Sequence, residues 1–163
     1  MVTFETYQFK DTTYGLTHLP YNTHLINETT LYLYYVSADN QCELWKYTKS
    51  LGTDELLQTR DHKIQALWND GTYIWGVDCD NDGTADDFDV WKILISDDTF
   101  TVIGTSAGAD ADSVYVLDVY VSGGNTYVSN IETRNAGVNK YIVIWDVDTA
   151  PFTEKDTQEI EVF

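Results

Sequence analysis

The chain has 163 residues, with 9 Lys and Arg against 27 Asp and Glu, so its formal net charge is −18. This length suits one domain with a sizeable core. A field of this sign repels phosphate backbones and anionic lipid headgroups, which argues against nucleic acids and membrane surfaces as partners. Because no run of about 18 apolar residues occurs, no membrane insertion is predicted.

The predicted elements are strands along the whole chain, and no segment shows a helical period. Short runs of β-branched and aromatic residues alternate with turn residues such as Asn69-Asp70-Gly71 and Gly123-Gly124-Asn125. The predicted strands are Val2–Phe9, Tyr14–Leu19, Thr30–Ser37, Glu43–Thr48, Glu55–Thr59, Lys63–Trp68, Thr72–Val77, Phe88–Leu94, Thr99–Thr105, Ser113–Ser122, Thr126–Glu132, Lys140–Val147 and Gln158–Phe163. This spacing is typical of an all-β sandwich, barrel or propeller.

A weak internal repeat favours the propeller. Each copy has an aromatic-led strand, a polar loop and then a strand that carries Trp45, Trp91 or Trp145. Periods of about 40–50 residues with four strands each are typical of propeller blades. The sequence therefore predicts one all-β repeat domain over residues 1–163, with three four-stranded antiparallel units near residues 10–60, 61–107 and 108–163.

Three blades are fewer than a closed ring contains, since propellers take four to eight. The ring is then incomplete or is completed by other protein chains, either further copies of this chain or a larger assembly. The alternative is a β-trefoil, which closes with three units. The repeated tryptophans are interpreted as packing between the units, because a core needs a large apolar residue at the same position of each.

Carboxylates are spaced between Asp78 and Asp89 as in a calcium loop. They stand at loop positions 1, 3, 5, 9 and 12, and Gly83 occupies position 6, where the chain must turn sharply. Calcium takes six to eight oxygen ligands, and acids at alternate positions of a curled loop converge on one point. The predicted metal ligands are Asp78, Asp80, Asp82, the carbonyl of Thr84, Asp86 and Asp89. The alternative is a solvated acidic turn that binds no ion.

Both flanks of this loop are predicted to be strands, so the loop connects the two strands of a hairpin and does not connect two helices. The segment VDCDNDGTADDFDVWKI, residues 77–93, resembles the calcium-loop hairpin of FG-GAP/VCBS-type β-propeller repeats, which occur in integrin α chains. The resemblance covers this hairpin only. It implies Ca²⁺ as the bound ion and the acids at positions 78, 80, 82 and 86 as its ligands.

Catalytic chemistry has little support in the sequence. His18, His24 and His62 are scattered, without a nucleophile beside them, and no phosphate-binding glycine motif occurs. The chain is therefore predicted not to be an enzyme. Cys42 and Cys79, the two cysteines, follow equivalent strands of consecutive repeats and are either disulfide-bonded or free thiols.

The leading hypothesis is a non-catalytic, calcium-stabilised structural or adhesive module of an extracellular or virion-surface assembly. Millimolar calcium is found in such a setting, although no signal peptide is visible at the N-terminus. Two alternatives remain open, a lectin-like module that binds glycans and a glycosidase. The carboxylate pair of a glycosidase is spatial, and spacing along the chain does not reveal it.

Overall fold

In the computed structural model, residues 20–27, 30–36, 42–79, 87–106, 111–134 and 139–160 are described. All regular structure in these ranges is β-strand, and none of their segments is a helix that could span a membrane. The strands are β1 (Pro20–Asn27), β2 (Thr30–Val36), β3 (Cys42–Thr48), β4 (Thr53–Arg60), β5 (Lys63–Asn69), β6 (Tyr73–Cys79), β7 (Phe88–Leu94), β8 (Phe100–Thr105), β9 (Ala111–Ser122), β10 (Asn125–Arg134), β11 (Asn139–Asp146) and β12 (Thr153–Ile160).

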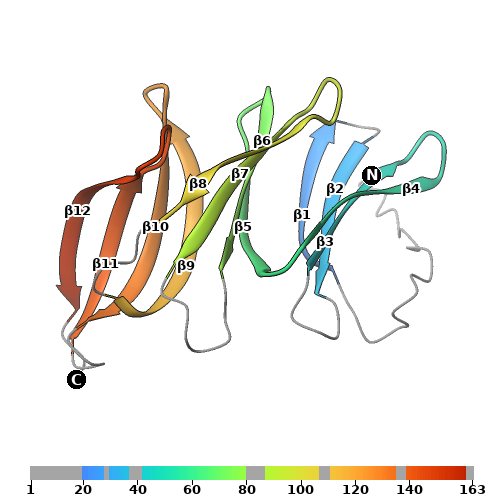
Figure 1. The fold of residues 1–163 in the computed structure, drawn as a ribbon. Coiled ribbons are helices and arrows are strands. Elements are labelled where there is room, and N and C mark those ends of the chain that lie inside the picture. The colour runs from blue at the N-terminus through green and yellow to red at the C-terminus, as the bar shows by residue number, and fades with distance from the viewer. Residues whose placement is uncertain are drawn as a thin grey trace, which may run out of the picture.

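These strands form three separate four-stranded sheets, in the orders β1-β2-β3-β4, β5-β6-β7-β8 and β12-β11-β10-β9. We call them the first, second and third blade. Every pairing is antiparallel, and each blade is a simple meander. The blades stand side by side with their faces toward one another, and β5 contacts both β1 and β9 (Figure 1). The predicted all-β, propeller-like fold is confirmed, and the three separate sheets favour it over the β-trefoil.

The repeated tryptophans occupy equivalent places in the three blades. Trp45, Trp91 and Trp145 lie on the third strand of the first, second and third blade. In each blade the register with the fourth strand shifts immediately before the tryptophan, as a β-bulge does. The same irregularity at the same place in each unit shows that the sequence repeat is also a structural repeat.

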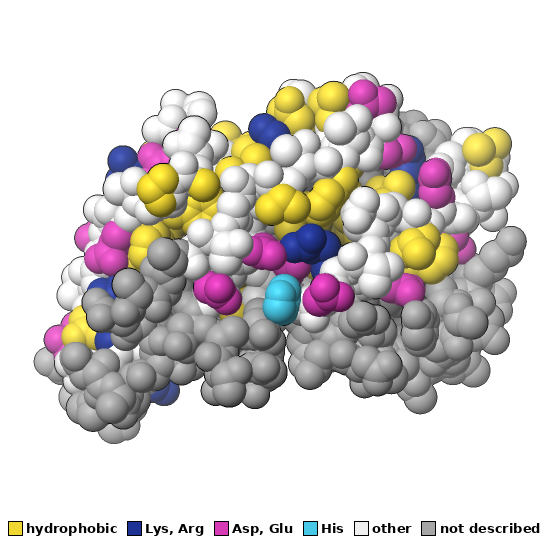
Figure 2. Space-filling model, in the orientation of Figure 1, with side chains coloured by type: hydrophobic (Ala, Val, Ile, Leu, Met, Phe, Trp, Pro, Cys, Tyr) yellow, Lys and Arg dark blue, Asp and Glu magenta, His cyan; other side chains and the backbone are white. Residues whose placement is uncertain are grey.

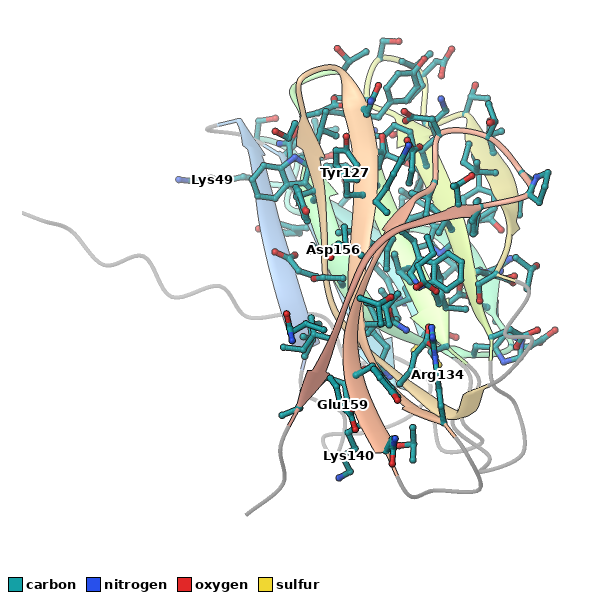
Figure 3. All side chains as sticks on the ribbon, turned by 90° about the vertical axis from the view of Figure 1, so that its left-hand side faces the viewer. Lys49, Tyr127, Arg134, Lys140, Asp156 and Glu159 are labelled. Carbon is teal, nitrogen blue, oxygen red and sulfur yellow. The ribbon has the colours of Figure 1, made fainter. Side chains whose placement is uncertain are left out.

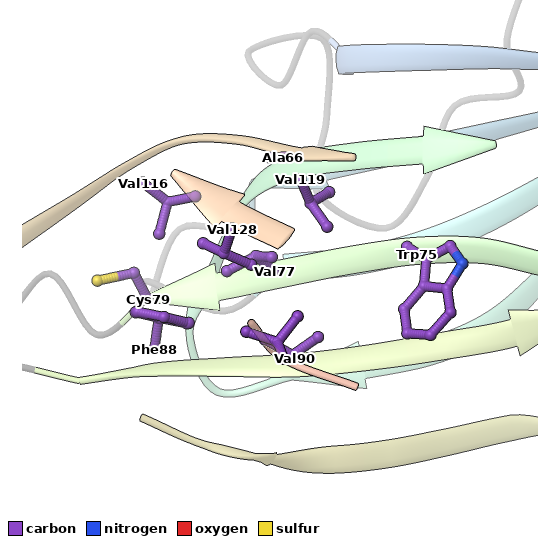
Figure 4. Packing of buried hydrophobic residues seen from close by; sticks show 10 residues of the cluster. Ala66, Trp75, Val77, Cys79, Phe88, Val90, Val116, Val119 and Val128 are labelled. Atoms are coloured by element: carbon purple, nitrogen blue, oxygen red, sulfur yellow. The ribbon is translucent and has the colours of Figure 1, made fainter. Parts of the chain in front are cut away.

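Two apolar clusters hold the blades together. The first seam, between the first and second blades, contains Cys42, Leu44, Ile64, Leu67, Ile74, Trp91 and Ile93. The second seam, between the second and third blades, contains Ala66, Trp75, Val77, Cys79, Phe88, Val90, Val116, Val119, Val128 and Val147 (Figure 4). The second blade supplies residues to both clusters because successive side chains of a strand point to opposite faces of its sheet.

Cys42 and Cys79 are not joined by a disulfide. Both are buried, with exposed fractions of 0% and 2%. Cys42 belongs to the first seam and accepts a hydrogen bond from the amide of Ile64, while Cys79 belongs to the second seam. Of the two alternatives that the sequence left open, the structure therefore has the free thiols.

Two strands differ from the sequence prediction. β1 covers Pro20–Asn27, where no strand was predicted, and β12 covers Thr153–Ile160, where the prediction placed its last strand at Gln158–Phe163. The predicted strands Val2–Phe9 and Tyr14–Leu19 lie outside the described residues.

Candidate functional site

The two ends of the predicted calcium loop are brought together in the second blade. Asp78, near the end of β6, and Asp89, near the start of β7, are direct cross-strand partners. Asp80, Asp82, Thr84 and Asp86 lie outside the described residues. The structure thus shows the base of the hairpin on which the acidic segment stands.

Arg60 lies between these two carboxylates. It is the last residue of β4, so it reaches from the first blade to the second. Its Nε donates to Asp78 Oδ2 at 2.7 Å, and its Nη2 donates to Asp89 Oδ2 at 2.9 Å. Its guanidinium carbon also lies 5.6 Å from the centre of the Phe100 ring. Arg60, Asp78 and Asp89 form what we call the Arg60 clamp.

The other oxygens of the clamp are also used. The indole Nε1 of Trp91 donates to Asp78 Oδ1 at 3.1 Å, and the hydroxyl of Thr105 donates to Asp89 Oδ1. Asp78 is completely buried, whereas the side chains of Arg60 and Asp89 are 17% and 21% exposed. The clamp is therefore closed on the side of the first seam and reaches solvent at its rim. On the face shown in Figure 2, a basic side chain lies among acidic ones and beside a histidine.

Burial and charge act against each other within the clamp. Burial raises the pKa of the Asp78 carboxyl above its ordinary value, and the hydrogen bond and charge of Arg60 oppose that rise. For Arg60, burial favours the neutral form, but the hydrogen bond and charge of Asp78, with Asp89 and Asp61, hold its pKa above the ordinary value. Arg60 thus stays charged, and it is the positive charge that Asp78 needs in a buried position.

Asp78 and Asp89 bind an arginine in this structure. All four of their carboxylate oxygens accept hydrogen bonds, and the guanidinium between them would repel a second cation. Within the described ranges, no group of three or more His, Cys, Asp or Glu could hold a metal. The predicted calcium site stays a prediction, because four of its six residues lie outside the described ranges: Asp80, Asp82, Thr84 and Asp86.

A related polar cluster lies in the third blade. Trp145 Nε1 donates to Asn130 Oδ1 at 3.1 Å and to Glu132 Oε1 at 3.2 Å. Arg134 donates from Nε to Glu132 at 2.9 Å and from Nη2 to Glu154 at 2.9 Å. Asn130 stands where Asp78 stands in the second blade, since each lies two pairs beyond the partner of the blade's tryptophan. The tryptophan of the third strand thus requires a polar acceptor in both blades.

Sequence reasoning missed Arg60. The chain has two arginines, Arg60 and Arg134, and each ends a strand beside carboxylates in the structure. An arginine at a strand end in a chain of such strong negative charge was the available signal. Its partners, however, are 18 and 29 residues away, and only the stacking of one blade on the next brings them together.

Comparison with known proteins shows the fold. No protein-family model and no curated protein matches the sequence. Among solved structures, the chain is similar to "Oligogalacturonate lyase in complex with manganese", with a TM-score of 0.50 and 9% identity over 80% of this chain and 39% of that chain. It is also similar to a bifunctional GH43-CE protein of Bacteroides eggerthii, with a TM-score of 0.42 and 14% identity over 84% of this chain and 18% of that chain. Both are β-propeller enzymes, and this chain spans less than half of either.

The comparison corrects one expectation. The chain was predicted not to be an enzyme because its sequence lacks a catalytic motif, but the oligogalacturonate lyase whose fold it resembles is an enzyme. The lyase was solved with manganese, so a divalent metal is compatible with this type of fold. The FG-GAP/VCBS resemblance of the hairpin stays a prediction, since no family model matches.

Proposed function

We propose that the chain forms three consecutive blades of a carbohydrate-active β-propeller that binds a neutral oligosaccharide. The fold that it shares with an oligogalacturonate lyase over 80% of its length is the observation that carries this proposal. The net charge of −18 favours a neutral sugar over a polyanionic one, because the field would repel the latter.

The proposed binding edge is the one at which the Arg60 clamp lies. Antiparallel register places the end of β4, the start of β5, the end of β6 and the start of β7 together at this edge. Asp61 is exposed and His62 is half-buried directly after Arg60, so both offer polar groups to a sugar hydroxyl there. The clamp holds the two blades in place beneath them, which supports a preorganised site.

Titration calorimetry against neutral and uronic oligosaccharides tests this proposal. We expect a neutral oligosaccharide to bind, and we expect Asp61→Asn and His62→Ala each to weaken that binding about tenfold, as the loss of one hydrogen bond of about 1.4 kcal/mol does. Asp97→Asn is the matched control, since Asp97 is exposed in the turn between β7 and β8 at the opposite edge, where its carboxylate accepts hydrogen bonds from Thr99. Turnover of chromogenic glycosides would show that the chain also hydrolyses a sugar that it binds. No binding of any sugar at millimolar concentration would contradict the proposal.

A second candidate is a calcium-stabilised repeat module of an extracellular or virion-surface assembly. The specific observation in its favour is that the acidic segment 80–86 joins two strands in continuous register, with its base held by Arg60. Asp80, Asp82, Asp86 and the carbonyl of Thr84 are the proposed ligands, while Asp78 and Asp89 belong to the clamp. Such a site supplies charge compensation in a strongly acidic chain.

Calcium is then expected to raise the melting temperature relative to excess chelator. Calcium at ten times its dissociation constant stabilises the folded state by about 1.4 kcal/mol. Magnesium should raise the melting temperature less, because it gives up its water ligands reluctantly. Asp80→Ala should abolish the difference, and Asp97→Ala, which removes an exposed carboxylate from another hairpin, should preserve it. Identical melting curves in millimolar calcium and in chelator would exclude this site.

A further inference from the structure

The third blade exposes residues that the first and second blades bury. Counting back from the tryptophan of each third strand, the residue before it is Leu44, Val90 or Ile144, and the residue three before it is Cys42, Phe88 or Ile142. In the first and second blades these four side chains are at most 1% exposed. In the third blade Ile144 is only half-buried and Ile142 is 39% exposed.

The next blade along the chain is what covers these positions. Leu44 and Cys42 pack in the first seam with Trp91, which comes from the third strand of the second blade. Phe88 packs edge-on against Trp145 of the third blade, with ring centres 6.3 Å apart. In both seams, therefore, the tryptophan-bearing face of one blade lies on the opposite face of the blade before it.

The open face of the third blade continues this pattern. It presents Ile142 and Ile144 on β11, and Tyr127 on β10 stacks against Tyr120 on β9 with ring centres 5.5 Å apart. Figure 3 looks onto this side of the molecule, with Tyr127 toward one end and Lys140 and Glu159 toward the other. We call it the tail face. Cross-strand register also places Asp118, Asp146 and Asp156 on this face, so it is a mixed face with exposed apolar residues among carboxylates. Clustered apolar residues on an open sheet face are typical of an interface.

Among the strands that the structure describes, no blade lies against the tryptophan-bearing face of the first blade. Cys42 and Leu44 point toward the second blade. Because successive side chains of a strand point to opposite faces, Trp45 points away from the second blade. Leu56, its cross-strand partner on β4, is 44% exposed. We call this the head face. Head and tail faces are thus the two halves of the interface that the chain already makes twice within itself.

We propose that the tail face of one copy of this chain binds the head face of a second copy, so that two copies close a ring of six blades. Six lies within the range of four to eight blades that closed propellers take. Each contact is heterologous, and the two contacts together are related by a twofold axis. Closure is independent of which ligand the ring binds.

Charge sets the conditions under which the ring forms. Each copy carries a net charge of −18, so two copies repel each other at long range. Salt shortens the reach of this repulsion to about 8 Å at 0.15 M, while the apolar contact is unaffected at that ionic strength. Association is therefore expected to strengthen between low and physiological salt, the reverse of what an interface held by ion pairs shows.

Sedimentation velocity and light scattering test the ring. The wild-type chain should have twice its 18.6 kDa mass at physiological salt. Ile142→Asp on the tail face and Leu56→Asp on the head face should each give single chains with an unchanged circular dichroism spectrum. Leu51→Asp is the control, because Leu51 is 72% exposed in the turn between β3 and β4, away from the middle of both faces. A wild-type monomer at about 100 µM, or a dimer that survives both substitutions, would overturn the proposal.

Mixing the two variants separates this arrangement from other dimers. Ile142→Asp retains an intact head face, and Leu56→Asp retains an intact tail face, so a mixed pair contains one intact contact. The mixture should therefore form dimers although neither variant does alone. A symmetric tail-to-tail dimer predicts instead that Leu56→Asp dimerises by itself, and that result would contradict the ring.

Discussion

Arg60→Met is expected to lower the free energy of unfolding by about 3–5 kcal/mol at neutral pH. The substitution keeps a long apolar stem but leaves the Asp78 carboxylate, which is completely buried, without its positive partner. Removing one member of a buried ion pair has an effect of this size because the remaining charge is uncompensated. Urea denaturation at pH 7 measures it. Lys155→Met is the matched control, since Lys155 is 48% exposed and its pair with Asp146 should contribute at most about 1 kcal/mol.

The deficit of Arg60→Met should shrink as the pH falls. Burial raises the pKa of Asp78, and Arg60 opposes that rise, so the variant raises the folded-state pKa further. A group with a raised folded-state pKa contributes stability below its unfolded-state pKa, about 3.9 for Asp, and loses that contribution as the pH rises through the folded-state value. The variant should therefore approach the wild type near pH 4 and fall away from it toward pH 7. A deficit that does not change with pH would show that the charge of Asp78 is not its cause.

Gly76→Ala should destabilise the fold by about 1–3 kcal/mol. Gly76 is the cross-strand partner of Trp91, and an added Cβ would lie 2.1 Å from Cζ2 and Cη2 of the indole. Such a separation forces the fully buried indole to move within the first seam, where it also bonds Asp78. Chemical denaturation of the single variant measures the cost.

A double-mutant cycle identifies the clash as the reason. Trp91→Phe removes the two ring carbons that the new methyl group would meet, so Gly76→Ala should cost much less in that background. Loss of the indole hydrogen bond occurs in both arms that contain Trp91→Phe and cancels from the coupling energy. Additive effects of the two substitutions would contradict the steric explanation.

The sequence was sufficient to predict the inner strands of each blade. β6 and β7 alternate apolar residues or carry dense β-branched and aromatic runs because both of their faces are buried in seams. β12 gave no such signal: it is the outermost strand of the third blade, and its residues are exposed or half-buried and mostly polar. β1 begins at Pro20 and continues through Asn22, Thr23 and His24, a composition that reads as a loop.

The candidate site, too, was only partly predictable from the sequence. The spacing of acids from Asp78 to Asp89 is visible along the chain because a hairpin brings neighbours in sequence together. The partner of these acids was invisible because Arg60 belongs to another blade, and its position depends on how two sheets stack. Local patterns thus predicted the elements of each unit, whereas contacts between units required the structure.

The two thiols give each seam its own reporter of opening. Cys42 is buried in the first seam and Cys79 in the second, on opposite sides of the middle sheet, with 0% and 2% of their surfaces exposed. A thiol reagent can modify either sulfur only after the blades around it separate, so the labelling rate of each measures the opening free energy of one seam. In repeat architectures, where neighbours contact only neighbours, those two values need not be equal. Their ratio would show whether the middle blade parts first from the blade before it or from the blade after it.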